Sequence, residues 1–122
     1  MKSTKIELDF MENKVKKWLF DAAEAAQNIK TFCHEKTFDD YNESLMLQSA
    51  VERQFEILGE ALRRIREVNP EIIVSIPGSR EAISFRNMLA HEYGHIDDSI
   101  VWSIIINELP QLSQKIKDLL YQ

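Results

Sequence analysis

A long run of apolar residues, spaced three and four positions apart, occupies the first quarter of the chain. Side chains at that spacing share one face of an α-helix. We expect this helix to begin at Thr4 or Asp9, each with a glutamate three residues on as a capping pair, and to end near Cys33. The helix is therefore predicted to pack along most of its length through one stripe: Leu8, Met11, Val15, Trp18, Ala22, Ala26, Ile29 and Cys33.

Three further helical patterns follow, separated by short polar breaks. The second is predicted over residues 37–68, and the third runs from residue 79, with Ser79 as its cap, to His91 or Tyr93. The fourth starts at residues 97–99 and continues to the end of the chain. Pro110 lies inside it and should kink or split it, because proline lacks the amide hydrogen that an interior turn needs.

Two details refine this pattern. Gly59 inside the second helix costs about 1 kcal/mol against alanine, so we expect it to mark a close contact with another helix. Glu60 and Arg64 are spaced as a helical ion pair.

Residues 72–76 are apolar and strand-like, but no second strand pattern is available to pair with them. We interpret that segment as an apolar connector packed against the helices.

The predicted fold class is therefore all-α: one domain over residues 1–122, arranged as an up-and-down four-helix bundle, or five helices if Pro110 splits the last. The last helix carries more apolar surface than one bundle seam uses. That surplus suggests a homodimer face, and the residues concerned are Trp102, Ile104, Ile105 and Ile106.

Composition narrows the class of protein. The chain of 122 residues is 44% hydrophobic and 29% charged, which is ordinary globular composition. The single cysteine, Cys33, excludes an internal disulfide and fits a reducing cytoplasm. Residues 1–7 do not resemble a signal peptide, and no apolar run is long enough to span a membrane. The net charge of −5 argues against nonspecific coating of nucleic acid but leaves room for a local basic site.

The polar residues of the third helix are the candidate functional site. Arg86 falls within the apolar arc of that helix. Tyr93, seven residues on, falls within about 20° of Arg86 around the helix axis. Asn87 and His91, four residues apart, form a second polar stripe. An arginine in a buried arc is unfavourable unless it is paired. A purely structural alternative is an ion pair with a carboxylate of the second helix, and the candidates are Glu52, Glu56 and Glu60.

The segment His91-Glu92-Tyr93-Gly94-His95 also matches the H-E-x-x-H pattern of zinc peptidases. That interpretation requires the helix to continue through His95, although Gly94 is typical of a helix end. It also requires a third ligand, and His34 and Glu108 are both poorly placed in the sequence. A zinc peptidase is therefore the least favoured of three candidate functions, and we expect no metal or other cofactor.

Arg86 is followed by a spacer of four residues that begins with Asn87, and then by His91, any residue and Tyr93. This pattern resembles the signature of the HEPN superfamily, in particular the HepT-like toxins of prokaryotic toxin–antitoxin pairs. Residues 53–61 resemble the second-helix segment of these toxins. Val101-Trp102 followed by Leu109-Pro110 resembles their last helix. The resemblance covers the chain from about residue 37 onward. The chain has no tryptophan just before the arginine, where many relatives carry one.

The resemblance implies a homodimeric, metal-independent endoribonuclease with the motifs of both subunits facing one cleft. Arg86 would hold phosphate oxygens, Asn87 would orient the phosphate or the histidine, and His91 would act as general base or acid. The expected product is a 2′,3′-cyclic phosphate.

The resemblance also implies a partner, a minimal nucleotidyltransferase antitoxin that adenylylates Tyr93 and so silences the toxin. A different class of function remains open: a helical module without catalysis that positions a nucleotidyltransferase or its substrate. Intact Arg86, Asn87 and His91 favour the enzyme, because a pure binding module has no need of that set.

Overall fold

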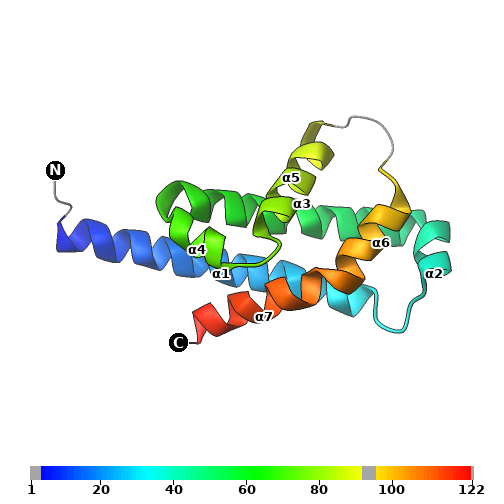
Figure 1. Ribbon diagram of the computed structural model, residues 1–122, viewed down its shortest axis with the longest axis horizontal. Helices are drawn as coiled ribbons and strands as arrows, with labels where there is room; N and C mark the ends of the chain where they lie inside the picture. Colours follow the sequence, from blue (N-terminus) through cyan, green and yellow to red (C-terminus); the bar gives the residue numbers. More distant parts are fainter. Residues whose placement is uncertain (1–3, 92–95, 122) are drawn as a thin grey trace.

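The computed structural model describes residues 4–91 and 96–121, which form seven α-helices and no strand. The all-α prediction is confirmed. Two long helices, α1 and α3, run antiparallel through the molecule, α7 lies along α1, and α5 rises from α3 (Figure 1). None of the helices in the described part of the chain is long and apolar enough to cross a membrane. The helices are α1 Lys5–Phe32, α2 Phe38–Glu43, α3 Leu45–Val68, α4 Pro70–Ser75, α5 Ser79–His91, α6 Asp98–Asn107 and α7 Leu109–Leu120.

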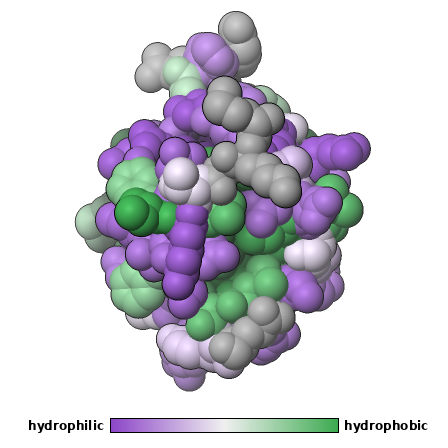
Figure 2. All heavy atoms as spheres, turned by 90° about the vertical axis from the view of Figure 1, so that its left-hand side faces the viewer, coloured by the Kyte–Doolittle hydropathy of each residue, from purple (hydrophilic) through white to green (hydrophobic). Residues whose placement is uncertain are grey.

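The first helix begins at the earlier of its two predicted caps. The hydroxyl of Thr4 accepts a hydrogen bond from the amide of Glu7 at 3.1 Å. From Val15 onward the predicted stripe is buried, with Trp18 half-buried, but Leu8 and Met11 are 49% and 36% exposed. That part of the prediction is wrong because the first turns of α1 extend beyond its partner helices (Figure 1). Figure 2, which views this end of the molecule, shows hydrophobic surface among hydrophilic surface.

The helix predicted over residues 37–68 is interrupted at Ser44, so it forms α2 and α3. The Ser44 hydroxyl accepts a hydrogen bond from the amide of Leu47 at 3.1 Å and caps α3. The side chain of Gln48 donates to the carbonyl oxygen of Tyr41 at 3.0 Å. This bond supplies a partner to a backbone carbonyl in the last turn of α2. A serine side chain thus competes with the helical hydrogen bonds. The break buries Tyr41, whose ring lies 5.6 Å from that of Trp102 in α6.

The apolar connector is helical. Asn69 caps it and Pro70 occupies its first turn, so residues 70–75 form α4 with Ile73 buried. Ser79 does not cap α5 as predicted: it is the first residue of that helix, and its buried hydroxyl donates to the carbonyl oxygen of Ile73 at 2.8 Å. That bond ties α5 to α4.

The prediction for Pro110 is confirmed. The last helical pattern is split, and α6 ends at Asn107 while α7 begins at Leu109 with Pro110 in its first turn. Asp97 caps α6 by accepting from the amide of Ser99 at 2.8 Å. The change of direction between α6 and α7 places α7 against α1 (Figure 1).

Gly59 of α3 lies at the crossing with α5, as its position in the sequence predicted. A Cβ atom added there would overlap the Cβ of Arg86 and would lie 2.8 Å from the carbonyl oxygen of Ala82. The missing side chain therefore lets α5 approach α3 closely at the turn that carries Arg86. Next to this contact, the rings of Phe55 and Phe85 meet edge to face at 5.0 Å.

Replacement of Gly59 by alanine is expected to destabilise the fold by about 2 kcal/mol, because the clash outweighs the gain in helix propensity. The carbonyl oxygen of Ala82 belongs to the backbone and cannot rotate away. Urea denaturation would measure the change, with Ala61→Ser as a control for alteration of a small buried residue on α3. An unchanged midpoint for Gly59→Ala would show that the helices separate freely.

Candidate active site

The candidate site lies where α5 crosses α3. Arg86 and Glu60 are each about three-quarters buried, with side chains 28% and 26% exposed, and Arg86 Nη2 lies 2.9 Å from Glu60 Oε2. The ion pair that was the structural alternative for Arg86 is present, and of the three candidate carboxylates Glu60 makes it. Arg86 Nη1 also donates to Asn87 Oδ1 at 3.2 Å. The guanidinium is therefore held between two helices and a neighbouring amide.

Glu60 is the centre of an arginine cluster. Its carboxylate accepts from Arg63 Nη2 at 2.8 Å and from Arg64 Nε at 3.0 Å, in addition to its ion pair with Arg86. The Glu60–Arg64 pair matches the prediction. Hydrogen bonds from Arg63 and then Arg64 lower the pKa of Glu60 to about 2. Glu60 stays ionised at neutral pH and cannot serve there as a general acid.

The cluster makes stability depend on acid pH. The pKa of Glu60 falls from its ordinary value of 4.5 to about 2 on folding. Since the unfolded chain takes up the proton first, the stabilisation is complete above pH ~4.5 and is lost as pH falls toward ~2. A quarter of the side chain is in water, so we expect about 1–2 kcal/mol rather than the full value of the shift.

Urea denaturation of wild type and Glu60→Gln at about pH 6 and about pH 3 would measure this loss. Between these two pH values, Glu60→Gln should lose less free energy of unfolding than wild type. Glu71→Gln, at an exposed position on α4, should lose as much as wild type. Parallel losses in wild type and Glu60→Gln would contradict the assignment.

The remaining predicted site residues lie at the end of α5. Asn87 is exposed, and His91 is the exposed last residue of that helix. They are four residues apart on the same helix and therefore share a face. Tyr93, the predicted modification site, lies outside the described residues, as do Glu92 and His95 of the zinc pattern. The structure tests neither of those predictions.

Beside Arg86 lies a hollow of about 430 Å³ between α1, α3 and α5. The hollow brings together cations from separate helices, among them Lys17 of α1 and Arg53 of α3. Lys17 pairs with Asp21 at 3.2 Å, and Arg53 pairs with Glu56 at 3.5 Å. The indole of Trp18 is half-buried at the same place. No local signal could have indicated this grouping, because it arises from three helices at once.

Fold and site together define an all-α protein with a fixed arginine beside an asparagine and a histidine on one helix. Residues 22–119 match the family described as Ribonuclease HepT-like. The match includes the end of α1, upstream of the residue 37 at which the resemblance was expected to begin. The chain therefore belongs to the HepT-like ribonuclease family.

Individual relatives agree with this assignment. The chain is 33% identical over 109 residues to "Probable ribonuclease HepT" of Thermococcus cleftensis, covering 89% of this chain and 98% of that one. It is 30% identical over 103 residues to "Putative RNase MJ1380" of Methanocaldococcus jannaschii, covering 84% and 94%. A third relative, "Putative RNase TTE0752" of Caldanaerobacter subterraneus, is 31% identical over 84 residues, covering 69% and 74%. No solved structure gives a significant match.

Proposed function

We propose that the chain is a metal-independent endoribonuclease and the toxin of a prokaryotic toxin–antitoxin pair, acting in the cytoplasm. Family membership supports ribonuclease activity. The observation that carries the particular site is the fixed Arg86, held by Glu60 at 2.9 Å on the helix that ends at His91. An arginine bound in place on one side presents its remaining donors to a phosphate in a defined orientation.

The chemistry needs few groups, because RNA supplies its own nucleophile. The 2′-oxygen forms a bond to phosphorus, the bond from phosphorus to the 5′-oxygen breaks, and a 2′,3′-cyclic phosphate and a 5′-hydroxyl result. In the proposed reaction His91 accepts the proton of the 2′-hydroxyl or delivers one to the 5′-oxygen. Arg86 stabilises the negative charge that builds on the phosphate oxygens.

Asn87 has a defined place in this proposal. In the structure its side-chain oxygen accepts from Arg86 Nη1, on the exposed side of the guanidinium. A phosphate oxygen can replace that acceptor, while Glu60 keeps its contact with the other terminal nitrogen. The freed amide of Asn87 would then orient the phosphate or His91.

We propose a homodimer in which the two motifs face one another. Support comes from a hollow of about 550 Å³ between α5 and α6, which has a largely apolar lining. Ile100 and Met88 line it and are 57% and 49% exposed. Of the four residues predicted for a dimer face, Ile105 is buried, Trp102 and Ile104 are half-buried, and Ile106 is 54% exposed. A second copy would cover Ile100 and Met88, while Ile106 lines a different hollow.

The proposed regulator is a nucleotidyltransferase antitoxin that modifies Tyr93. In that reaction the Tyr93 oxygen attacks the α-phosphorus of ATP, and pyrophosphate leaves. The added AMP would lie close along the chain to Arg86 and His91 and would compete with RNA for the cationic site. This part of the proposal rests on the family resemblance and on the position of Tyr93 two residues after His91.

The test is RNA cleavage by protein purified without its antitoxin, in excess EDTA, with His91→Ala and Arg86→Ala in parallel. Cleavage that survives EDTA and is lost in both variants supports the proposal. Cleavage abolished by EDTA would contradict the metal-independent mechanism. No cleavage of messenger or transfer RNA by the unmodified dimer would favour the alternative, a binding module that positions a nucleotidyltransferase or its substrate.

A further inference from the structure

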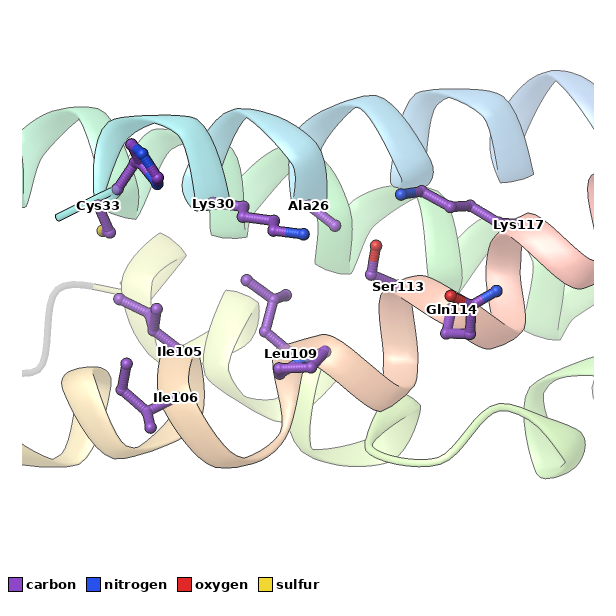
Figure 3. Close-up of a pocket in the computed structure, with 11 residues that line it drawn as sticks. Ala26, Lys30, Cys33, Ile105, Ile106, Leu109, Ser113, Gln114 and Lys117 are labelled. Atoms are coloured by element: carbon purple, nitrogen blue, oxygen red, sulfur yellow. The ribbon is translucent and has the colours of Figure 1, made fainter.

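A third hollow lies away from the candidate active site, between the C-terminal end of α1 and the junction of α6 and α7 (Figure 3). Its volume is about 390 Å³, and it shares no lining residue with the hollow beside Arg86. A volume of this order is typical of small-molecule sites. Nothing in the proposed ribonuclease reaction uses it.

The charge of this hollow is opposite to that of the whole chain. Three of its lining side chains are basic, those of Lys30, His34 and Lys117, and none of its lining residues is acidic. The chain as a whole has a net charge of −5. Among the described residues, no carboxylate pairs with Lys30 or Lys117. Lys117 Nζ instead lies 3.5 Å from the side-chain oxygen of Gln27. The two ammonium groups are therefore available to an anion.

The side chains of Lys30 and Lys117 extend toward one another from facing helices, and the hydroxyl of Ser113 points into the space between α7 and α1 (Figure 3). Two ammonium groups and a hydroxyl supply several hydrogen-bond donors around one position. Such an arrangement matches the oxygens of a phosphate group. The imidazole of His34 is 77% exposed, and its Nε2 lies 3.6 Å from Glu35 Oε1.

The floor of the hollow is apolar. Ala26, Ile105 and Leu109 are 1%, 6% and 5% exposed, and the ring of Pro110 lies beside them. Apolar side chains at this position offer no hydrogen-bond partner to an inorganic anion but can contact the ring or chain of an organic one. A ligand that uses the whole hollow therefore has a charged end and an apolar body.

We propose that this hollow binds a small organic phosphate monoester, with the phosphate between Lys30 and Lys117 and an aromatic or aliphatic body on the Ile105–Leu109 floor. A mononucleotide has this chemistry. The limited volume favours a small ligand over an extended chain. The site is independent of the proposed ribonuclease reaction, so it stands whether or not RNA is cut.

Calorimetric titration with guanosine 5′-monophosphate would test the site, with guanosine and inorganic phosphate as the two halves of the probe. We expect the monophosphate to bind, and either half to bind about tenfold or more weakly. Lys30→Met and Lys117→Met should each weaken binding by about tenfold or more, the effect of losing a charged hydrogen bond. Lys16→Met makes the same change at an exposed position of α1 and should have no effect.

Three outcomes would overturn the proposal. Absence of saturable binding at millimolar monophosphate would remove the site, and equal affinity for inorganic phosphate would remove the role of the apolar floor. Binding that is lost in Arg86→Ala but kept in Lys30→Met would place the nucleotide at the candidate active site.

Discussion

Arg86→Ala is expected to lower the rate of RNA cleavage by about 10²–10³-fold, the usual effect of removing one donor that stabilises charge in a transition state. The fold should survive this change for two reasons. Alanine keeps the Cβ that packs against Gly59, and Glu60 keeps its bonds to Arg63 and Arg64. Cleavage kinetics and urea denaturation on the same preparations would separate loss of catalysis from loss of structure.

Arg86→Lys sharpens this prediction. Lysine restores the positive charge but not the planar guanidinium that contacts Glu60 and a phosphate at once. We therefore expect Arg86→Lys to recover little of the lost rate, although it can still pair with Glu60. Arg66→Ala serves as the control. Arg66 is exposed on α3, the helix that carries the arginine cluster, so this variant should leave kcat nearly unchanged. A large loss of stability in Arg86→Ala, with activity lost only in proportion to the unfolded fraction, would make Arg86 a structural residue.

The fold was largely predictable because helical periodicity depends on residues close in sequence. The stripe from Val15 to Cys33 and the break at Pro110 follow from local rules that the structure obeys. One error occurred where a side chain competes with the backbone. Ser44 can sit inside a helix or cap one, and the choice depends on the distant contact between Tyr41 and Trp102.

The candidate site was only partly predictable. Because Arg86 lies in an apolar arc, the sequence predicted that it needs a charged partner. The sequence did not decide which of three glutamates is that partner. Gly59 accounts for the observed pairing, because the absence of a side chain there lets α5 approach α3 next to Glu60. The convergence of three arginines on that carboxylate, and the hollow that includes Lys17 and Trp18, depend on how α1 packs, which no local pattern encodes.

The structure also indicates why Arg86 is held by a carboxylate that already has other partners. Arg63 and Arg64 would keep Glu60 ionised and in place if Arg86 moved or bound a phosphate. The carboxylate therefore acts as a fixed support, and its negative charge is offset by the two other arginines. Glu60 can position Arg86 without cancelling the positive potential that a phosphate needs.

Phe85→Ala is expected to destabilise the fold by about 3–5 kcal/mol, the second large effect. Phe85 is 5% exposed, immediately precedes Arg86, and meets the ring of Phe55 edge to face at 5.0 Å. Its removal leaves a cavity between α3 and α5 that neighbouring backbone cannot close. Because this contact fixes the turn of α5 that carries Arg86, cleavage should also fall at temperatures where the variant remains folded.

Urea denaturation would give the size of this effect, with Met46→Ala on α3 as the matched control. Met46 is 83% exposed, so its truncation should change stability by less than about 1 kcal/mol. Phe85→Leu, which keeps most of the apolar volume, should recover more than half of the lost stability. Equal losses for Phe85→Ala and Met46→Ala would mean that α5 is not anchored through Phe85, and the close approach at Gly59 would then have to position Arg86 alone.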